Sequence, residues 1–233
     1  MKYLNTQFDF GAESGEETGE SKQALQARLN ALRERGREIA PEDATGQARL
    51  QRDESALLVN LEQGEDAWKL AKQAFDTFAR LELWEDAVQT CDILFQCEQP
   101  DSLSALGQGV WLAVTFPVDP ELTVAMLQNI VDETPEDADG AAVAAATAAY
   151  VTDLRAKDKQ LEDLQFFSMQ LMGSVARRHS GIEEQDDFKE WLEKLELNDP
   201  SKFLVRLRNV IDVLVQDDWW VDRDAIHAKL PVH

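Results

Sequence analysis

Apolar side chains recur at helical spacing through residues 65–135, and this periodicity restricts the chain to a helical fold. In the first part of the stretch, one helix face is formed by Trp68, Ala71, Phe75 and Phe78. The same period resumes at Trp84 and stops before Pro100, which cannot continue a helix. Because only a few residues separate the two apolar stripes, we predict two helices that turn back on each other as an antiparallel hairpin.

A second hairpin is predicted directly after the first. Its two apolar faces are Leu103, Leu106, Val110 and Ala113, followed by Leu122, Met126, Leu127, Ile130 and Val131. Asp119 and Pro120 between them are typical of a helix start, with a carboxylate at the N-cap and proline at the first helical position. Pro135 then ends the second hairpin.

Two consecutive helix pairs of about 35 residues that each end in proline resemble the tetratricopeptide repeat. The residues that carry the resemblance lie within residues 65–135 and are Phe78, Trp84, Ala87 and Pro100 in the first pair, and Leu106, Gly107, Ala125 and Pro135 in the second. The resemblance implies hairpins stacked into a superhelix with a concave, peptide-binding surface. Lys72 and Phe75 depart from the pattern, which expects a small residue there, so a non-repeat helical bundle stays open as the alternative.

The rest of the chain continues the helical pattern and shows no alternation typical of β-strands. An alanine-rich helix is predicted over residues 140–156, and we expect it at the centre because small side chains let neighbouring helices approach closely. The next helix has a broad apolar face formed by Leu161, Leu164, Phe166, Phe167, Met169, Leu171, Met172 and Val175. The predicted fold class is all-α, with antiparallel helical hairpins stacked as a bundle or as a short tetratricopeptide-like solenoid.

The chain divides by composition into three parts. Residues 1–20 are predicted to be a disordered acidic leader, because glycines and carboxylates offer nothing to bury. Residues 21–40 are predicted to form an amphipathic arm helix with a narrow leucine stripe and several arginines. Residues 41–233 are expected to form one all-helical domain, with a possible sub-boundary near residues 181–187. Within it, an acidic linker is predicted over residues 183–187 and a last helix over residues 222–230.

Two groups of residues are candidate partner contacts. Trp219 and Trp220 are adjacent and precede Arg223; adjacent tryptophans on a helix point in different directions, so an exposed one would mark a contact surface and two buried ones would mark a junction. Arg177 and Arg178 allow two interpretations. They form an anion-binding site, or they are cations that complement the C-terminal end of a helix.

The net charge of −22 is the most informative global property of the chain. It argues against direct binding of nucleic acid or anionic membranes, since both depend on cations that meet phosphates. Two interpretations stay open: the charge only keeps the surface solvated, or it attracts a partner protein with a basic surface. The sequence near Met1 has no signal-like apolar run, and no segment is apolar for long enough to cross a bilayer. We therefore expect a cytoplasmic protein, and the oligomeric state stays open.

The sequence contains no glycine-rich phosphate loop, serine–histidine–acid set or histidine pair at metal spacing. We therefore expect no catalytic residue, cofactor or metal ion. The main hypothesis is a non-catalytic protein–protein interaction module, which would act as an adaptor, assembly factor or chaperone-like protein on a basic or peptide partner. The alternative is an acidic decoy that mimics nucleic acid and occupies a basic protein, and the third hypothesis is a helical enzyme.

Overall fold

The computed structural model describes residues 2–4 and 21–230. These residues form helices and loops without a β-strand, which confirms the all-α prediction. Of the predicted acidic leader, residues 1–20, Met1 and residues 5–20 lie outside the described ranges, whereas residues 2–4 are described and are bonded to the helical body. The helices are α1 (Lys22–Gly36), α2 (Ala44–Asn60), α3 (Gly64–Arg80), α4 (Trp84–Gln96), α5 (Ser102–Thr115), α6 (Pro120–Glu133), α7 (Gly140–Arg155), α8 (Asp158–Ser180), α9 (Gln185–Lys194), α10 (Pro200–Val215) and α11 (Arg223–His227).

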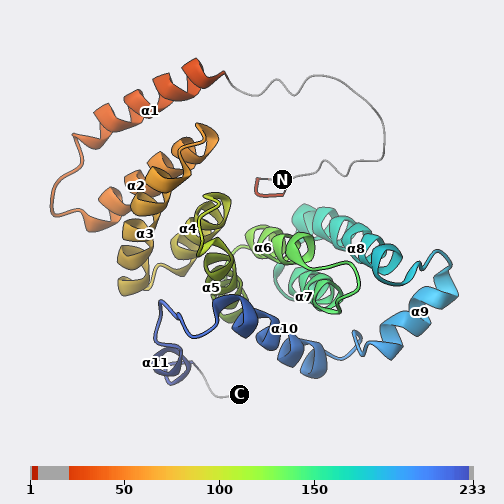
Figure 1. The fold of residues 1–233 in the computed structure, drawn as a ribbon. Coiled ribbons are helices and arrows are strands. Elements are labelled where there is room, and N and C mark those ends of the chain that lie inside the picture. Colours follow the sequence, from red (N-terminus) through yellow and green to blue (C-terminus); the bar gives the residue numbers. More distant parts are fainter. Residues whose placement is uncertain (1, 5–20, 231–233) are drawn as a thin grey trace.

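Consecutive helices from α1 to α8 pack against each other (Figure 1). The even-numbered helices are also in contact with the next even-numbered one, from α2 through α4 and α6 to α8, and so form one continuous row. On the other side, α10 packs against both α5 and α7. The C-terminal part of the chain therefore returns over the odd-numbered helices.

Several turns between helices share one local structure. Glu62, Glu82 and Glu196 each follow a helix end and have positive φ angles of 61°, 55° and 53°. In the turn at Glu62, the next backbone N–H, from Gln63, donates to the carbonyl of Leu58 at 2.9 Å, and equivalent bonds follow Glu82 and Glu196. This is the Schellman arrangement, which satisfies the last carbonyls of a helix and reverses the chain direction. These three turns thus form with glutamate, and not glycine, in the left-handed conformation.

The alanine-rich helix α7 is central, as the sequence predicts. Its residues from Ala141 to Ala148 are all buried, and it packs against α6, α8 and α10. A helix covered on several sides has no room for large side chains, which explains its composition. Most of the core is one continuous cluster that extends from α3 and α4 through α7 to α10.

Three predictions for the surrounding helices are wrong in detail. Phe166 and Met169 do not belong to the buried face of α8 but are 65% and 75% exposed, whereas Met172 is buried. The acidic linker is shorter than expected because α9 already begins at Gln185. The last helix, α11, is also shorter than predicted, because Ala228 already caps it.

Both N-terminal described segments lie against the helical body. Helix α1 packs on α2 through a second, smaller cluster of apolar residues that includes Leu25, Leu29 and Leu58. Residues 2–4 cross the even-numbered row: the backbone N–H of Tyr3 donates to the Glu121 carboxylate at 2.7 Å, and the side-chain amide of Gln89 donates to the Tyr3 hydroxyl at 2.9 Å. The predicted arm helix is therefore docked on the domain in this structure.

Candidate functional site

The C-terminal segment, residues 216–230, leaves α10 and crosses the outer sides of α5 and α3 (Figure 1). Gln216 has a φ of 55° and turns the chain away from the helix axis. Residues 217–221 then run without helical structure as far as Asp222, whose carboxylate caps α11 by accepting from the Ala225 N–H at 2.9 Å. The segment is held by side chains more than by helix packing.

Gln108 on α5 holds the backbone of this segment. Its side chain is fully buried, and its amide nitrogen donates to the Asp218 carbonyl at 2.7 Å while its amide oxygen accepts from the Trp220 N–H at 3.1 Å. A buried amide left without partners costs roughly 1–3 kcal/mol, so these two bonds matter for the site. Because they are made to the peptide backbone, they place no condition on the side chains of the bound segment.

Trp220 lies between aromatic and cationic groups of α3. Its ring forms T-shaped pairs with Phe75, at a centroid distance of 5.2 Å, and with Trp68, at 6.1 Å, and the Lys72 ammonium lies 4.8 Å from its centre. Edge-to-face aromatic pairs and cation–π contacts each add about 0.5–1.5 kcal/mol beyond the buried area. Trp220 is thus the first side-chain anchor of the segment.

Trp219 is the second anchor and points to α5. Its ring lies 5.8 Å from that of Trp111, and the Arg223 guanidinium stacks over it at 3.8 Å. Arg223 also donates to the Asp212 carboxylate of α10 at 2.9 Å, so its guanidinium is held by both Trp219 and Asp212. Trp219 and Trp220 are both half-buried, at the junction of the C-terminal segment with α5 and α3 respectively.

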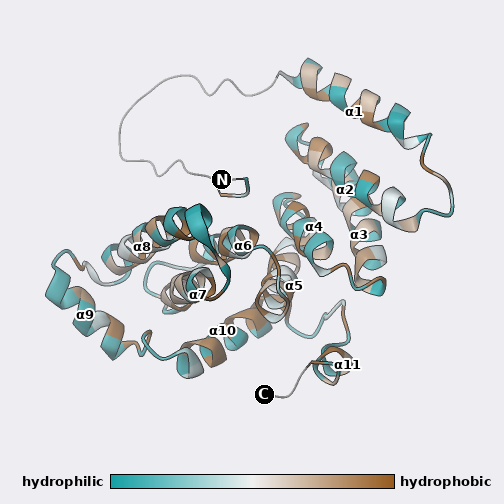
Figure 2. Ribbon diagram, turned by 180° about the vertical axis from the view of Figure 1, so that it is seen from behind, coloured by the Kyte–Doolittle hydropathy of each residue, from teal (hydrophilic) through white to brown (hydrophobic). Residues whose placement is uncertain are grey.

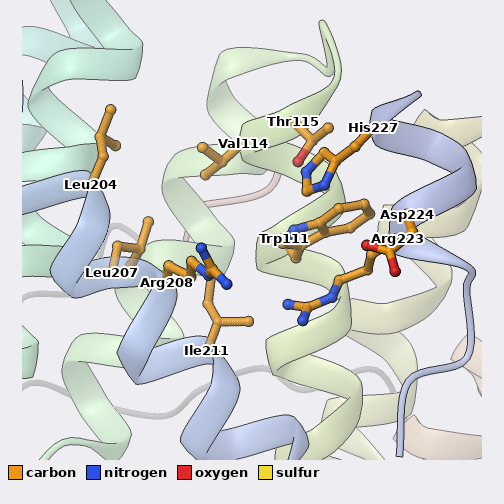
Figure 3. Close-up of a pocket in the computed structure, with 10 residues that line it drawn as sticks. All are labelled: Trp111, Val114, Thr115, Leu204, Leu207, Arg208, Ile211, Arg223, Asp224 and His227. Carbon is orange, nitrogen blue, oxygen red and sulfur yellow. The ribbon is translucent and has the colours of Figure 1, made fainter. Parts of the chain in front are cut away.

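An open pocket of about 380 Å³ adjoins this contact, between α5, α10 and α11 (Figure 3). Trp111 and Ile211 form part of its apolar wall, while Arg208, Arg223 and His227 line it with nitrogen atoms. Trp111 and Arg223, which both contact Trp219, also line this pocket, so the pocket adjoins the contact of the C-terminal segment with α5.

Arg177 and Arg178 lie on α8 and belong to another part of the molecule. Arg178 donates to the Val131 carbonyl of α6 at 2.9 Å, and the neighbouring His179 lies 3.1 Å from the Asp139 carboxylate. Gly181 caps the helix with a φ of 63°. This arrangement is that of cations at a helix end, and the structure does not bring Arg177 or Arg178 together with Trp219, Trp220 and Arg223.

The two cysteines are not activated as nucleophiles. Burial raises the pKa of Cys91, and it raises that of Cys97 to about 11, so both thiols are protonated at neutral pH and are poor nucleophiles. Both cysteines are free. Across residues 2–4 and 21–230, no group of three or more histidine, cysteine or carboxylate side chains is arranged to hold a metal ion.

Sequence reasoning names Trp219, Trp220 and Arg223 as candidate partner contacts, which stays a prediction, but it does not identify the side chains that these residues contact in the structure. Gln108 and Trp111 are not singled out by the sequence, and Trp68 and Lys72 are assigned there to the first hairpin without a role in this contact. One signal was available: Gln108 is a polar residue in the middle of an otherwise apolar helix, where an amide needs a buried partner. Its partners lie about 110 positions away, which no local pattern reveals.

Comparisons with protein-family models, curated proteins and solved structures find no match to this chain. Within the part of the chain that the structure describes, no helix combines the length and the apolar character needed to cross a membrane.

Proposed function

We propose that the protein is a non-catalytic protein–protein interaction module that binds an extended peptide segment across α3 and α5. In this proposal its own C-terminal segment occupies the site in the free protein, and a partner segment replaces it. The module would serve as an adaptor, assembly factor or chaperone-like protein.

The bonding of Gln108 is the observation that carries the proposal. A buried side-chain amide that donates to one backbone carbonyl and accepts from the backbone N–H two residues later recognises an extended chain of any sequence. The aromatic contacts on either side then select the side chains. Together they provide the two components of peptide recognition, backbone bonds for affinity and side-chain pockets for specificity.

The charge supports a partner with a basic surface. The net charge is −22, and Asp217 and Asp218 at the start of the C-terminal segment are exposed. A segment that replaces residues 217–221 without these carboxylates would relieve like-charge repulsion with the acidic helical body. A basic protein with an aromatic, extended segment therefore fits the site better than an acidic one.

Affinity capture from native lysate with three forms of the full chain tests the proposal. The forms are wild type, Trp219→Ala/Trp220→Ala, which loosens the C-terminal segment, and Gln108→Leu, which removes both backbone bonds at similar volume. We expect one captured protein to increase with the double variant and to decrease with Gln108→Leu, with all three forms matched for folding by circular dichroism. A partner captured equally by all three forms would contradict a role for this site.

A further inference from the structure

A second apolar surface lies at the other end of the molecule, between α8 and α9. It consists of two adjoining hollows of about 500 and 240 Å³ that share Met169 and Phe188. We call them the α8–α9 groove. Along α8 the groove runs from Gln165 to Arg177, which at 1.5 Å per residue is about 18 Å, or roughly three helical turns.

The groove persists because α9 covers its neighbours only in part. Trp191 on α9 and Leu197 just after it are buried. Helix α9 otherwise makes no extended packing along another helix, and it lies at the edge of the molecule in both views (Figure 1, Figure 2). Met169 thus stays 75% exposed beside the groove, with Phe166 65% exposed one turn earlier. Adjacent large apolar side chains at such exposure are typical of a contact surface.

The chemistry of the groove suits a helix better than an extended peptide. Ala146 and Ala149 form a flat part of its wall, and Met169 and Met172 are flexible side chains that adapt to a partner. The buried hydroxyl of Ser168 is already paired with Thr152 at 3.3 Å. Among the described residues of the groove, no buried side-chain nitrogen or oxygen lacks a hydrogen-bond partner. A helix, whose backbone hydrogen bonds are made within itself, can therefore bind there without leaving polar groups unsatisfied.

The charged residues that line the groove favour a positively charged partner. Asp153 lines one hollow, and Glu183 and Glu184 line the other, against a single cation, Arg177. A second copy of this chain would bring the same excess of carboxylates to the contact and be repelled. From this complementarity we propose that the α8–α9 groove binds an amphipathic helix of another protein, with apolar side chains against Met169 and Phe188 and with lysines or arginines along its flanks.

The proposal is tested with the full chain and fluorescein-labelled synthetic helices. The probe is a 14-residue peptide with leucines on one face and lysines on the flanks. Two matched peptides serve as controls, one with glutamates in place of the lysines and one with the same composition in scrambled order. Fluorescence anisotropy at low salt should show binding of the amphipathic lysine peptide alone. Equal binding of either control peptide, or no binding of the probe, would overturn the proposal.

Two groove variants and one control variant test whether the peptide binds in the groove. Met169→Glu should weaken binding of the lysine peptide about tenfold or more, because it puts a charge at the apolar centre of the contact. Val213→Glu on α10 is the matched control: Val213 is 74% exposed, lies outside the groove, and should leave the affinity unchanged. Glu183→Gln/Glu184→Gln should weaken binding several-fold and reduce its salt dependence.

The same variants also separate a second copy from a partner helix. In sedimentation experiments, we expect the wild-type chain and Met169→Glu to have the same oligomeric state. A dimer abolished by Met169→Glu, or equal loss of peptide binding in Val213→Glu and Met169→Glu, would overturn the assignment of the groove to a basic amphipathic helix.

Discussion

Gly107 on α5 lies directly against Val215 at the end of α10, and a Cβ atom at position 107 would be 2.6 Å from Val215 Cγ2. Val215 is buried, so it cannot simply turn away. This close approach brings α10 onto α5 and starts the C-terminal segment next to Gln108.

Gly107→Ala should therefore destabilise the protein although alanine is the better helix former. Alanine gains about 1 kcal/mol in helix propensity, but overpacking costs about 1–3 kcal/mol. Gly173→Ala on α8 is the matched control, because only the end of the Arg177 side chain comes within 4 Å of its Cβ position. Urea unfolding should show a loss for Gly107→Ala and a gain of about 0.5–1 kcal/mol for Gly173→Ala. Gains of equal size would mean that α5 and α10 are not in close contact.

The central position of α7 predicts that its buried alanines tolerate no larger side chain. Ala145 and Ala148 are completely buried, so Ala145→Leu and Ala148→Leu should each destabilise by about 1–3 kcal/mol. Ala149→Leu on the same helix should cost less, because Ala149 lines an open hollow. Thermal unfolding midpoints of the three variants provide the measurement, and unchanged midpoints for both buried positions would show that α7 is not central.

A half-buried carboxylate on α4 predicts a specific pH dependence. Burial raises the pKa of Asp92, while hydrogen bonds from Gln96 at 2.9 Å and Asn129 at 3.2 Å oppose the rise. Since the folded pKa lies above the unfolded one, ionisation of Asp92 costs stability as pH rises through the folded value, and this cost is absent below the unfolded value.

In unfolding experiments from acidic to neutral pH, Asp92→Asn should therefore become more stable relative to wild type as pH rises. Asp137→Asn, at an exposed position, gives the reference for the loss of one surface charge. The opposite result would be a stability of Asp92→Asn that falls relative to wild type as pH rises. It would mean that the hydrogen bonds stabilise the ionised carboxylate by more than burial destabilises it.

The charge of the helical body predicts electrostatic steering of the partner. Only five of the 45 acidic residues lie in residues 5–20, so most of the field comes from the helices. The on-rate of a captured partner should fall as salt shortens the Debye length from ~10 Å at 0.1 M to ~3 Å at 1 M. Deletion of residues 5–20 should preserve most of this dependence. An on-rate that does not respond to salt would exclude steering, and a dependence lost with the deletion would assign it to the leader.

Local patterns predict the helices well because each amphipathic stripe and each proline stop is contained in one short stretch. Asp119 illustrates this: it accepts from the Glu121 N–H at 2.8 Å as a cap before Pro120, as the sequence indicates. Helical periodicity wrongly places Phe166 and Met169 on a buried face, and both are exposed. Periodicity gives the width of an apolar face, but it does not show whether another helix covers the whole of that face. α9 is too loosely packed to cover Phe166 and Met169.

The sequence indicates the tryptophans of the candidate site but not the side chains that surround them. Adjacent tryptophans signal a contact from sequence alone, whereas the position of Trp220 between Trp68 and Phe75 depends on the return of the chain over α3. The tetratricopeptide-like resemblance of residues 65–135 stays a prediction.

We propose that α3 and α5 form a peptide site which the C-terminal segment fills. The most direct measurement is a titration of the full chain with a labelled peptide of residues 214–226, in wild type, in Trp219→Ala/Trp220→Ala, and in the same double variant with Gln108→Leu added. We predict that the double variant binds the peptide at least tenfold more tightly than wild type, since its own segment no longer competes, and that Gln108→Leu removes this gain. Equal affinity for all three proteins, or no binding by the double variant, would contradict the claim.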